Sequence, residues 1–242
     1  MDSGGKGKVL LVQHMPGKRD DRVSAWLAAA GYELDWRLRP EGEPLPAPEE
    51  GHAACVVYGG AQSANDPADE KPFISEVLDW IPRWVESERP FLGLCLGAQL
   101  LAKAHGAPVA PHPEGLHEIG YVPVEPTEAG RDFMAAPMHV YHWHNEGFDV
   151  PAGAELLAEG PTFPNQAFRL NMRTYGLQFH PETTPTIFSR WMAEAGHLLE
   201  KPGAHPRERQ FTDAAAHDAP LADWLDGFMR RWLGGDGGEN SA

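Results

Sequence analysis

The stretch that decides the fold is PFLGLCLGAQ, residues 90–99. Its first half is short and apolar, as in a strand buried on both faces of a sheet, and helix-spaced apolar residues follow as far as His105. Cys95 stands between the two, with Gly93 and Gly97 two residues away on either side. Such glycines permit a sharp strand-to-helix turn, and a helix start supplies free N–H groups and positive potential that favour a thiolate. The stretch therefore predicts a nucleophile elbow with Cys95 at its tip.

The chain before this elbow alternates between strands and helices. Three apolar segments have the pattern of strands: residues 8–14, 32–38 and 53–58. Between them, apolar side chains at helical spacing predict helices over residues 20–31 and 73–88. This alternation is typical of an α/β protein with right-handed crossovers. It predicts an open, mainly parallel sheet with helices on both faces.

The second half of the chain has a different pattern. Short apolar segments at hairpin-like spacing predict an antiparallel extension of the sheet: residues 119–124, 138–143, 154–158, 166–170 and 174–179. A helix at 187–196 would complete a domain over residues 1–198. Residues 199–242 are expected to form a polar linker as far as residue 216, followed by an amphipathic helix. The apolar stripe of that helix would pack on the same domain or on a second copy in a homodimer.

Composition and charge limit the classes of partner. The 242 residues include 20 Lys and Arg against 35 Asp and Glu, a formal net charge of −15. This charge repels phosphate backbones and anionic membrane surfaces, so neither nucleic acid nor a membrane is an expected partner. No signal-peptide pattern or apolar run of bilayer length is present, and the only cysteines are Cys55 and Cys95. The sequence predicts a cytoplasmic protein without a disulfide framework.

Two further segments end strands of the same predicted sheet. GLQFHPE, residues 176–182, places His180 and Glu182 two positions apart, and VYGGAQ, residues 57–62, ends its strand in a glycine pair. Active sites of open parallel sheets lie at the carboxyl edge of the strands, so both segments should meet the elbow there. A cysteine, a histidine and an acid together can act as nucleophile, base and orienting group.

Together the three segments resemble the class I glutamine amidotransferases, which have a cysteine nucleophile in G-x-C-x-G and a His-x-Glu near the end of the domain. The likeness spans residues 8–196 and is greatest to the stand-alone GMP synthase-like group. The order and spacing of that group recur in HWH 142–144, FD 148–149, NQAF 165–168 and the 176–182 segment. The resemblance implies a flavodoxin-like sheet and a γ-glutamyl amide substrate.

The resemblance also implies a role for each matching residue. Cys95 would attack the amide carbon, His180 would take the thiol proton and pass it to ammonia, and Glu182 would orient the imidazole. Water would then hydrolyse the glutamyl thioester. The backbone N–H groups of Gly60 and Leu96 would form the oxyanion hole. The substrate would be bound by a further set: Gln99, His144, Asn145, Glu146 and Gly147.

Three histidines close together in the sequence raise the question of a metal. His139, His142 and His144 lie within six positions, a density at which zinc sites occur. On a strand, His142 and His144 share one face whereas His139 points to the other, so a chelating trio, and hence a metal site, is not expected. Cys55 lies inside an apolar strand without ligand-type neighbours and is expected to pack in the core.

Neither a G-x-x-x-x-G-K-[ST] loop nor a G-x-G-x-x-G turn is present, so no cofactor is expected and any ATP-dependent amination would need another protein. Two functions share the first chemical step. The enzyme could deliver ammonia to a separate synthetase, or it could act as a γ-glutamyl peptidase or hydrolase on small γ-glutamyl compounds. A third interpretation is a non-catalytic binding or regulatory module on the same fold, which the complete set of Cys95, His180 and Glu182 disfavours.

Overall fold

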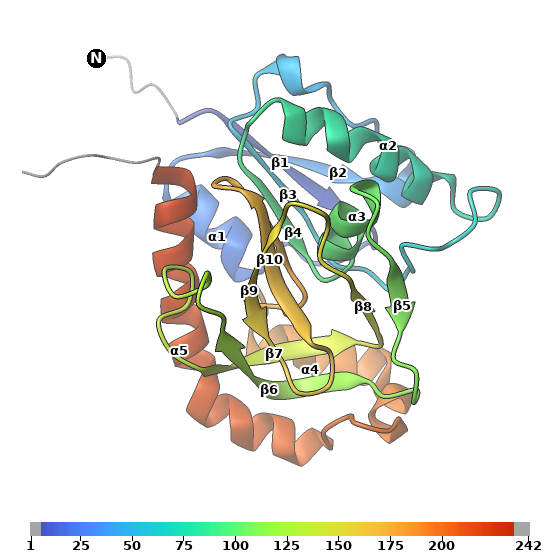
Figure 1. Ribbon diagram of the computed structural model, residues 1–242, viewed down its shortest axis with the longest axis vertical. Helices are drawn as coiled ribbons and strands as arrows, with labels where there is room; N and C mark the ends of the chain where they lie inside the picture. The colour runs from blue at the N-terminus through green and yellow to red at the C-terminus, as the bar shows by residue number, and fades with distance from the viewer. Residues whose placement is uncertain (1–5, 235–242) are drawn as a thin grey trace, which may run out of the picture.

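The protein, described here from a computed structural model over residues 6–234, is built around one large sheet (Figure 1). Nine strands form this sheet within the described residues. In spatial order they are β2 (Glu33–Leu38), β1 (Lys8–Gln13), β3 (Ala54–Val57), β4 (Phe91–Leu94), β11 (Thr174–Leu177), β10 (Asn165–Asn171), β9 (Glu155–Glu159), β6 (Glu118–Pro126) and β7 (Met138–His144). A small second sheet pairs β5 (Val109–Pro111) with β8 (Glu146–Phe148).

The large sheet has a parallel half and an antiparallel half. The strands β2, β1, β3, β4 and β11 pair in parallel, and every later pairing, from β11–β10 to β6–β7, is antiparallel. The predicted flavodoxin-like α/β sheet with an antiparallel extension is therefore confirmed.

Helices cover both faces of the sheet. They are α1 (Arg22–Ala29), α2 (Pro72–Glu86), α3 (Leu96–Ala104), α4 (Pro185–Glu194) and α5 (Arg207–Gly234), with short 3-10 turns η1 (Arg39–Glu41), η2 (Pro48–Glu50) and η3 (Gly196–Glu200). Side chains alternate along β1: Val9 and Leu11 belong to the core under α1, α4 and α5, whereas Leu10 and Val12 belong to the core under α2 and α3. The parallel strands are buried on both sides, as their continuous apolar sequences require.

The polar segment before the last helix is not a linker as far as residue 216. Helix α5 already begins at Arg207, because its polar first turns lie at the surface while Gln210 is buried and bonds the Tyr141 hydroxyl at 2.8 Å. Farther along, the apolar stripe is buried within this chain, and the indole N–H of Trp232 donates to the Arg173 carbonyl. In Figure 1, α5 runs up the left side of the molecule. The domain division at residue 198 stays a prediction, and residues 235–242 lie outside the described residues.

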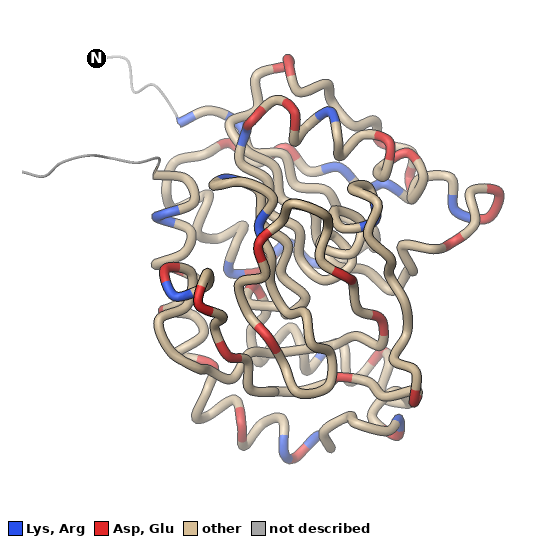
Figure 2. Tube along the Cα trace, in the orientation of Figure 1, with Lys and Arg blue, Asp and Glu red and all other residues tan. Residues whose placement is uncertain are grey.

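The acidic excess is distributed over the molecule. Figure 2 shows acidic residues on loops and helices on all sides of the view rather than gathered in one patch. None of the helices in the described range is long and apolar enough to span a membrane.

Candidate active site

The elbow between β4 and α3 holds Cys95 in a strained backbone conformation. Its φ angle is 49°, in the left-handed region that side chains other than glycine seldom adopt, and it immediately precedes the first residue of α3. The flanking glycines are required by close approach. A Cβ on Gly93 would lie 2.5 Å from the carbonyl oxygen of Gly97, and a Cβ on Gly97 would overlap the carbonyl oxygen of Val57. The elbow therefore presents the thiol at the carboxyl edge of the sheet.

His180 and Glu182 follow β11, which pairs with β4, and so lie at the same edge. The Nδ1 atom of His180 is 2.8 Å from Oε1 of Glu182, and both side chains are buried. The first amide of α1, at Arg22, donates to the Glu182 carbonyl, and the Trp191 ring from α4 stands edge-on to the His180 ring with centroids 5.0 Å apart. These contacts fix the plane of the imidazole and leave Nε2 for chemistry.

The charge state of His180 follows from its neighbours. Burial alone would lower the pKa of the imidazole, but the negative charges of Glu182 and Cys95 outweigh it and raise that pKa to about 10. The Nε2 atom is buried and has no hydrogen-bond partner among the described residues. A Cβ on Gly59 would lie 2.9 Å from Cε1 of His180 and 3.4 Å from Cβ of Cys95, so only glycine lets the ring and the thiol approach. The arrangement favours an imidazolium beside the cysteine.

Gly60 and Leu96, the predicted oxyanion donors, lie next to each other. A Cβ on Gly60 would be 3.1 Å from Cδ2 of Leu96, and neither backbone N–H donates to any described residue. Leu96 is the first residue of α3, so its amide is one of the free donors at a helix start. Many relatives have a proline where this chain has Ala61, and here the Ala61 amide contacts Sδ of Met15 at 3.2 Å. Two unused donors thus lie beside the nucleophile.

Gln178 is a residue of the site that the sequence motif contained without indicating a role. Its Nε2 atom is 3.6 Å from Sγ of Cys95, and its Oε1 accepts from Nε2 of Gln99 at 3.3 Å. The side chain is fully buried directly after β11. A glutamine within an apolar strand end is the signal that could have found it, because a buried amide needs partners.

The predicted substrate residues divide into two groups. Gln99, one helical turn after Cys95, donates to the Glu146 carbonyl at 2.8 Å, and Nδ1 of His144 is 3.0 Å from the same oxygen. These three residues form one hydrogen-bonded group. Asn145, by contrast, is exposed, and Gly147 lies in β8 against the Phe163 ring.

Comparison with known families agrees with this geometry. The model of the family described as glutamine amidotransferase class-I matches residues 23–196. This chain belongs to that family. Membership confirms the resemblance inferred from the sequence and indicates an enzyme of the amidotransferase kind.

Relatives of this amidotransferase are similar over most of their length. The YfeJ glutamine amidotransferase-like protein of Salmonella typhimurium is 34% identical over 73% of this chain and 76% of its own length. A glutamine-hydrolysing GMP synthase component from Ignicoccus hospitalis, itself one chain of a divided enzyme, is 30% identical, over 74% of this chain and 90% of its own. Among solved structures, a glutamine amidotransferase of Thermotoga maritima has 28% identity and a TM-score of 0.84, and covers 94% of this chain and 98% of its own.

The second cysteine of this amidotransferase lies away from the elbow. Cys55 is fully buried in β3, and burial raises the pKa of its thiol well above the ordinary value. It is free, as is Cys95. A buried neutral thiol packs as a small apolar group.

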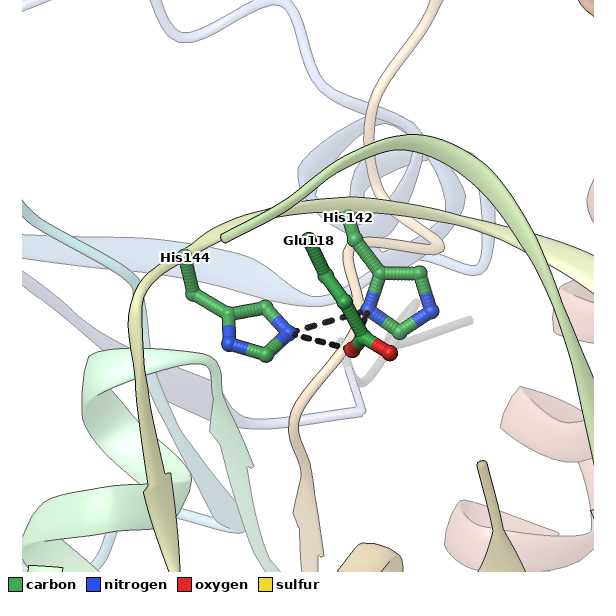
Figure 3. Close-up of side chains that lie close together, drawn as sticks. All are labelled: Glu118, His142 and His144. Atoms are coloured by element: carbon green, nitrogen blue, oxygen red, sulfur yellow. Dashed lines mark hydrogen bonds and ion pairs between the residues drawn. The ribbon is translucent and has the colours of Figure 1, made fainter. Parts of the chain in front are cut away.

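The histidine-rich strand β7 divides as the strand pattern predicts. His139 lies 4.1 Å from His217 of α5, ring centroid to ring centroid, whereas His142 and His144 point toward Glu118 of β6 (Figure 3). In the range from residue 6 to residue 234, these last three form the one group of side chains arranged to hold a metal ion.

Proposed function

We propose that this amidotransferase hydrolyses the side-chain amide of glutamine through Cys95, His180 and Glu182, with a glutamyl thioester intermediate and release of ammonia. One observation carries the proposal. The thiol of a strained elbow stands beside an imidazole whose far nitrogen is 2.8 Å from a buried carboxylate. This is the arrangement of a nucleophile, its base and the group that orients the base.

The first half-reaction follows from these positions. His180 holds the thiol proton at Nε2, the Cys95 thiolate attacks the amide carbon, and the carbonyl oxygen becomes an oxyanion. The free N–H groups of Gly60 and Leu96 stabilise that oxyanion. Collapse of the tetrahedral intermediate breaks the C–N bond, and His180 gives its proton to the leaving amine, which departs as ammonia.

The second half-reaction uses the same groups in reverse. His180, now neutral, removes a proton from water, and the hydroxide attacks the thioester carbon. The C–S bond breaks, the thiolate leaves, and glutamate is released. Glu182 keeps Nδ1 of His180 protonated and the ring oriented in both steps, with an ionised carboxylate throughout.

The unreactive end of glutamine requires partners for an ammonium and a carboxylate. We propose that Gln99 and the segment from His144 to Gly147 supply them. Support comes from the Glu146 carbonyl, which Gln99 and His144 hold in place from two sides. Such fixed dipoles cost little reorganisation when the substrate binds.

A separate synthetase is the acceptor of ammonia that we propose. Curated relatives that match this chain over nine-tenths of their own length are named as single components of a glutamine-hydrolysing GMP synthase, which supports a division between a glutaminase and a second chain. The free thiols of Cys55 and Cys95 suit the cytoplasm, where cysteines stay reduced. Hydrolysis of γ-glutamyl peptides remains the second candidate because its chemistry at Cys95 is the same.

The test measures ammonia and glutamate release from glutamine, and amine release from γ-glutamyl peptides, by the full chain alone. Cys95→Ala is expected to abolish turnover and Cys55→Ala to retain it per folded molecule. Steady peptide turnover favours the peptidase, and turnover that rises only when a synthetase is added favours the amidotransferase component. Full activity of Cys95→Ala, or no hydrolysis of any γ-glutamyl amide in either arm, would overturn the proposal.

A further inference from the structure

The ribbon of β6 and β7 brings three ligand-type side chains to one place. In its antiparallel register Glu118 is directly opposite His144, and Gly120 is opposite His142. Alternate residues of a strand share a face, so His142 and His144 both point to the side on which Glu118 lies. Figure 3 shows the three side chains pointing toward one another. None of them belongs to the Cys95 triad.

Their ligand atoms form a small closed triangle. The Nε2 atom of His144 is 3.0 Å from Oε2 of Glu118 and 3.1 Å from Nδ1 of His142, and the third side, from that Nδ1 to Oε2, is 3.5 Å. The side chains are 2% exposed or less. Water does not compete with a ligand here, because the triangle is closed off from solvent.

Hydrogen-bond accounting shows that this triangle needs a cation. The Nδ1 atom of His144 faces only the carbonyl oxygen of Glu146, an acceptor, so Nδ1 carries a proton. In the neutral ring Nε2 then has a lone pair, and it faces a carboxylate oxygen and a second ring nitrogen. A proton between two of the three atoms leaves the third without a partner. One metal ion can satisfy all three.

We propose that Glu118, His142 and His144 bind one divalent transition-metal ion of the zinc type. Zinc lies about 2.0–2.2 Å from nitrogen and carboxylate ligands, and at tetrahedral or octahedral angles such bonds set neighbouring ligand atoms about 3.0–3.5 Å apart. This range matches the three sides of the triangle. Two imidazoles and one carboxylate form a ligand set that suits zinc, cobalt, nickel and iron rather than calcium or magnesium.

The surroundings of the triangle match those of metal sites. A metal-bound histidine generally donates its other N–H to a carbonyl or a carboxylate, as His144 does to Glu146. The carboxylate is itself held, because Nε2 of Gln166 donates to Oε2 of Glu118 at 2.9 Å. The bound ion would therefore fix His144 and, through it, the Glu146 carbonyl. Ion binding itself does not depend on the proposed glutamine chemistry.

The experiment measures metal content of the full chain. The purified protein is stripped with a chelator, dialysed against Zn²⁺ or Co²⁺, and analysed for bound metal and for Tm. We expect one ion per chain and a Tm rise of roughly 5–10 °C at a metal concentration 100-fold above Kd. Glu118→Gln and His142→Asn should abolish both effects. The matched control is His139→Asn, on the same strand but the opposite face, which should keep both.

Two further measurements keep the proposal falsifiable. Cys95→Ser should retain the ion, and loss of stoichiometric binding in that variant would assign the metal to the triad instead. If a Glu118 variant fails to fold, anomalous scattering from crystals of the wild-type chain soaked in Zn²⁺ decides, with a peak expected between the three ligand atoms. Absence of stoichiometric metal in the wild type would leave a proton in that position and overturn the proposal.

Discussion

Replacement of Gln178 tests whether the residue beside the nucleophile contributes to catalysis. Gln178→Ala removes the N–H donor 3.6 Å from Sγ of Cys95 and the oxygen that accepts from Gln99. A hydrogen bond to a charged group contributes about 1.5–3 kcal/mol, and the length of this one favours the lower end. About 1.5 kcal/mol corresponds to a roughly tenfold loss of kcat/KM. Gln99 keeps its bond to the Glu146 carbonyl, so the pocket is retained.

The assay compares glutamine hydrolysis per folded molecule with stability measured by urea unfolding. The matched control is Gln210→Ala, which also truncates a fully buried glutamine but one bonded to Tyr141 and His205. Both variants should lose about 1–3 kcal/mol of stability, and only Gln178→Ala should lose turnover. Gln178→Glu, which sets a carboxylate beside the thiolate, should lose more than the alanine variant. Equal turnover losses at Gln178 and Gln210, or wild-type turnover of Gln178→Ala, would refute this reasoning.

Three other perturbations probe the triad and its elbow. His180→Ala should lower kcat by about 10⁴-fold, and the double variant with Cys95→Ala should be little worse than either single one, because both serve one step; additive losses would argue against a shared step. The pKa of His180, about 10 against an ordinary value of 6.5, gives stability that is fully present below pH 6.5 and lost as the pH rises through 10. Urea unfolding across this range should show a flatter loss in Cys95→Ala, which lacks one of the charges that raise the pKa; identical pH profiles would contradict it. Gly97→Ala should fail to fold or lose the elbow, as judged by circular dichroism and activity, because its Cβ would overlap the Val57 carbonyl; a stable, active variant would show that the contact is not needed.

The elbow and the parallel half could be predicted because their signals are local. Gly93 and Gly97 are needed for contacts within one turn of Cys95 and with the adjacent strand, so the sequence around the thiol already carries the constraint. The buried parallel strands are continuous apolar runs, and alternation with helices fixes their connection. His180 and Glu182 could be assigned for the same reason, since both follow a strand end directly.

The contacts of Glu118 and Gln178 could not be predicted because they depend on register and side-chain direction. Glu118 meets His144 only through the pairing of β6 with β7, and Gln178 meets Cys95 only because β11 lies beside β4. The strands β5 and β8 have three residues each, too few for a periodic pattern. The start of α5 could not be predicted because polar residues dominate its first turns, and helical periodicity of apolar residues is the signal that sequence patterns use.

The Glu146 carbonyl connects the two halves of the sheet at the active site. On one side it accepts from Gln99 of α3, which bonds Gln178 and through it reaches Cys95. On the other side it faces Nδ1 of His144, whose second nitrogen lies 3.0 Å from Glu118. The parallel half therefore supplies the nucleophile, while the antiparallel ribbon fixes the position of a polar group in the pocket. Since buried polar networks are stable only when every member is satisfied, a change at Glu118 should be felt at the substrate before it is felt at the thiol.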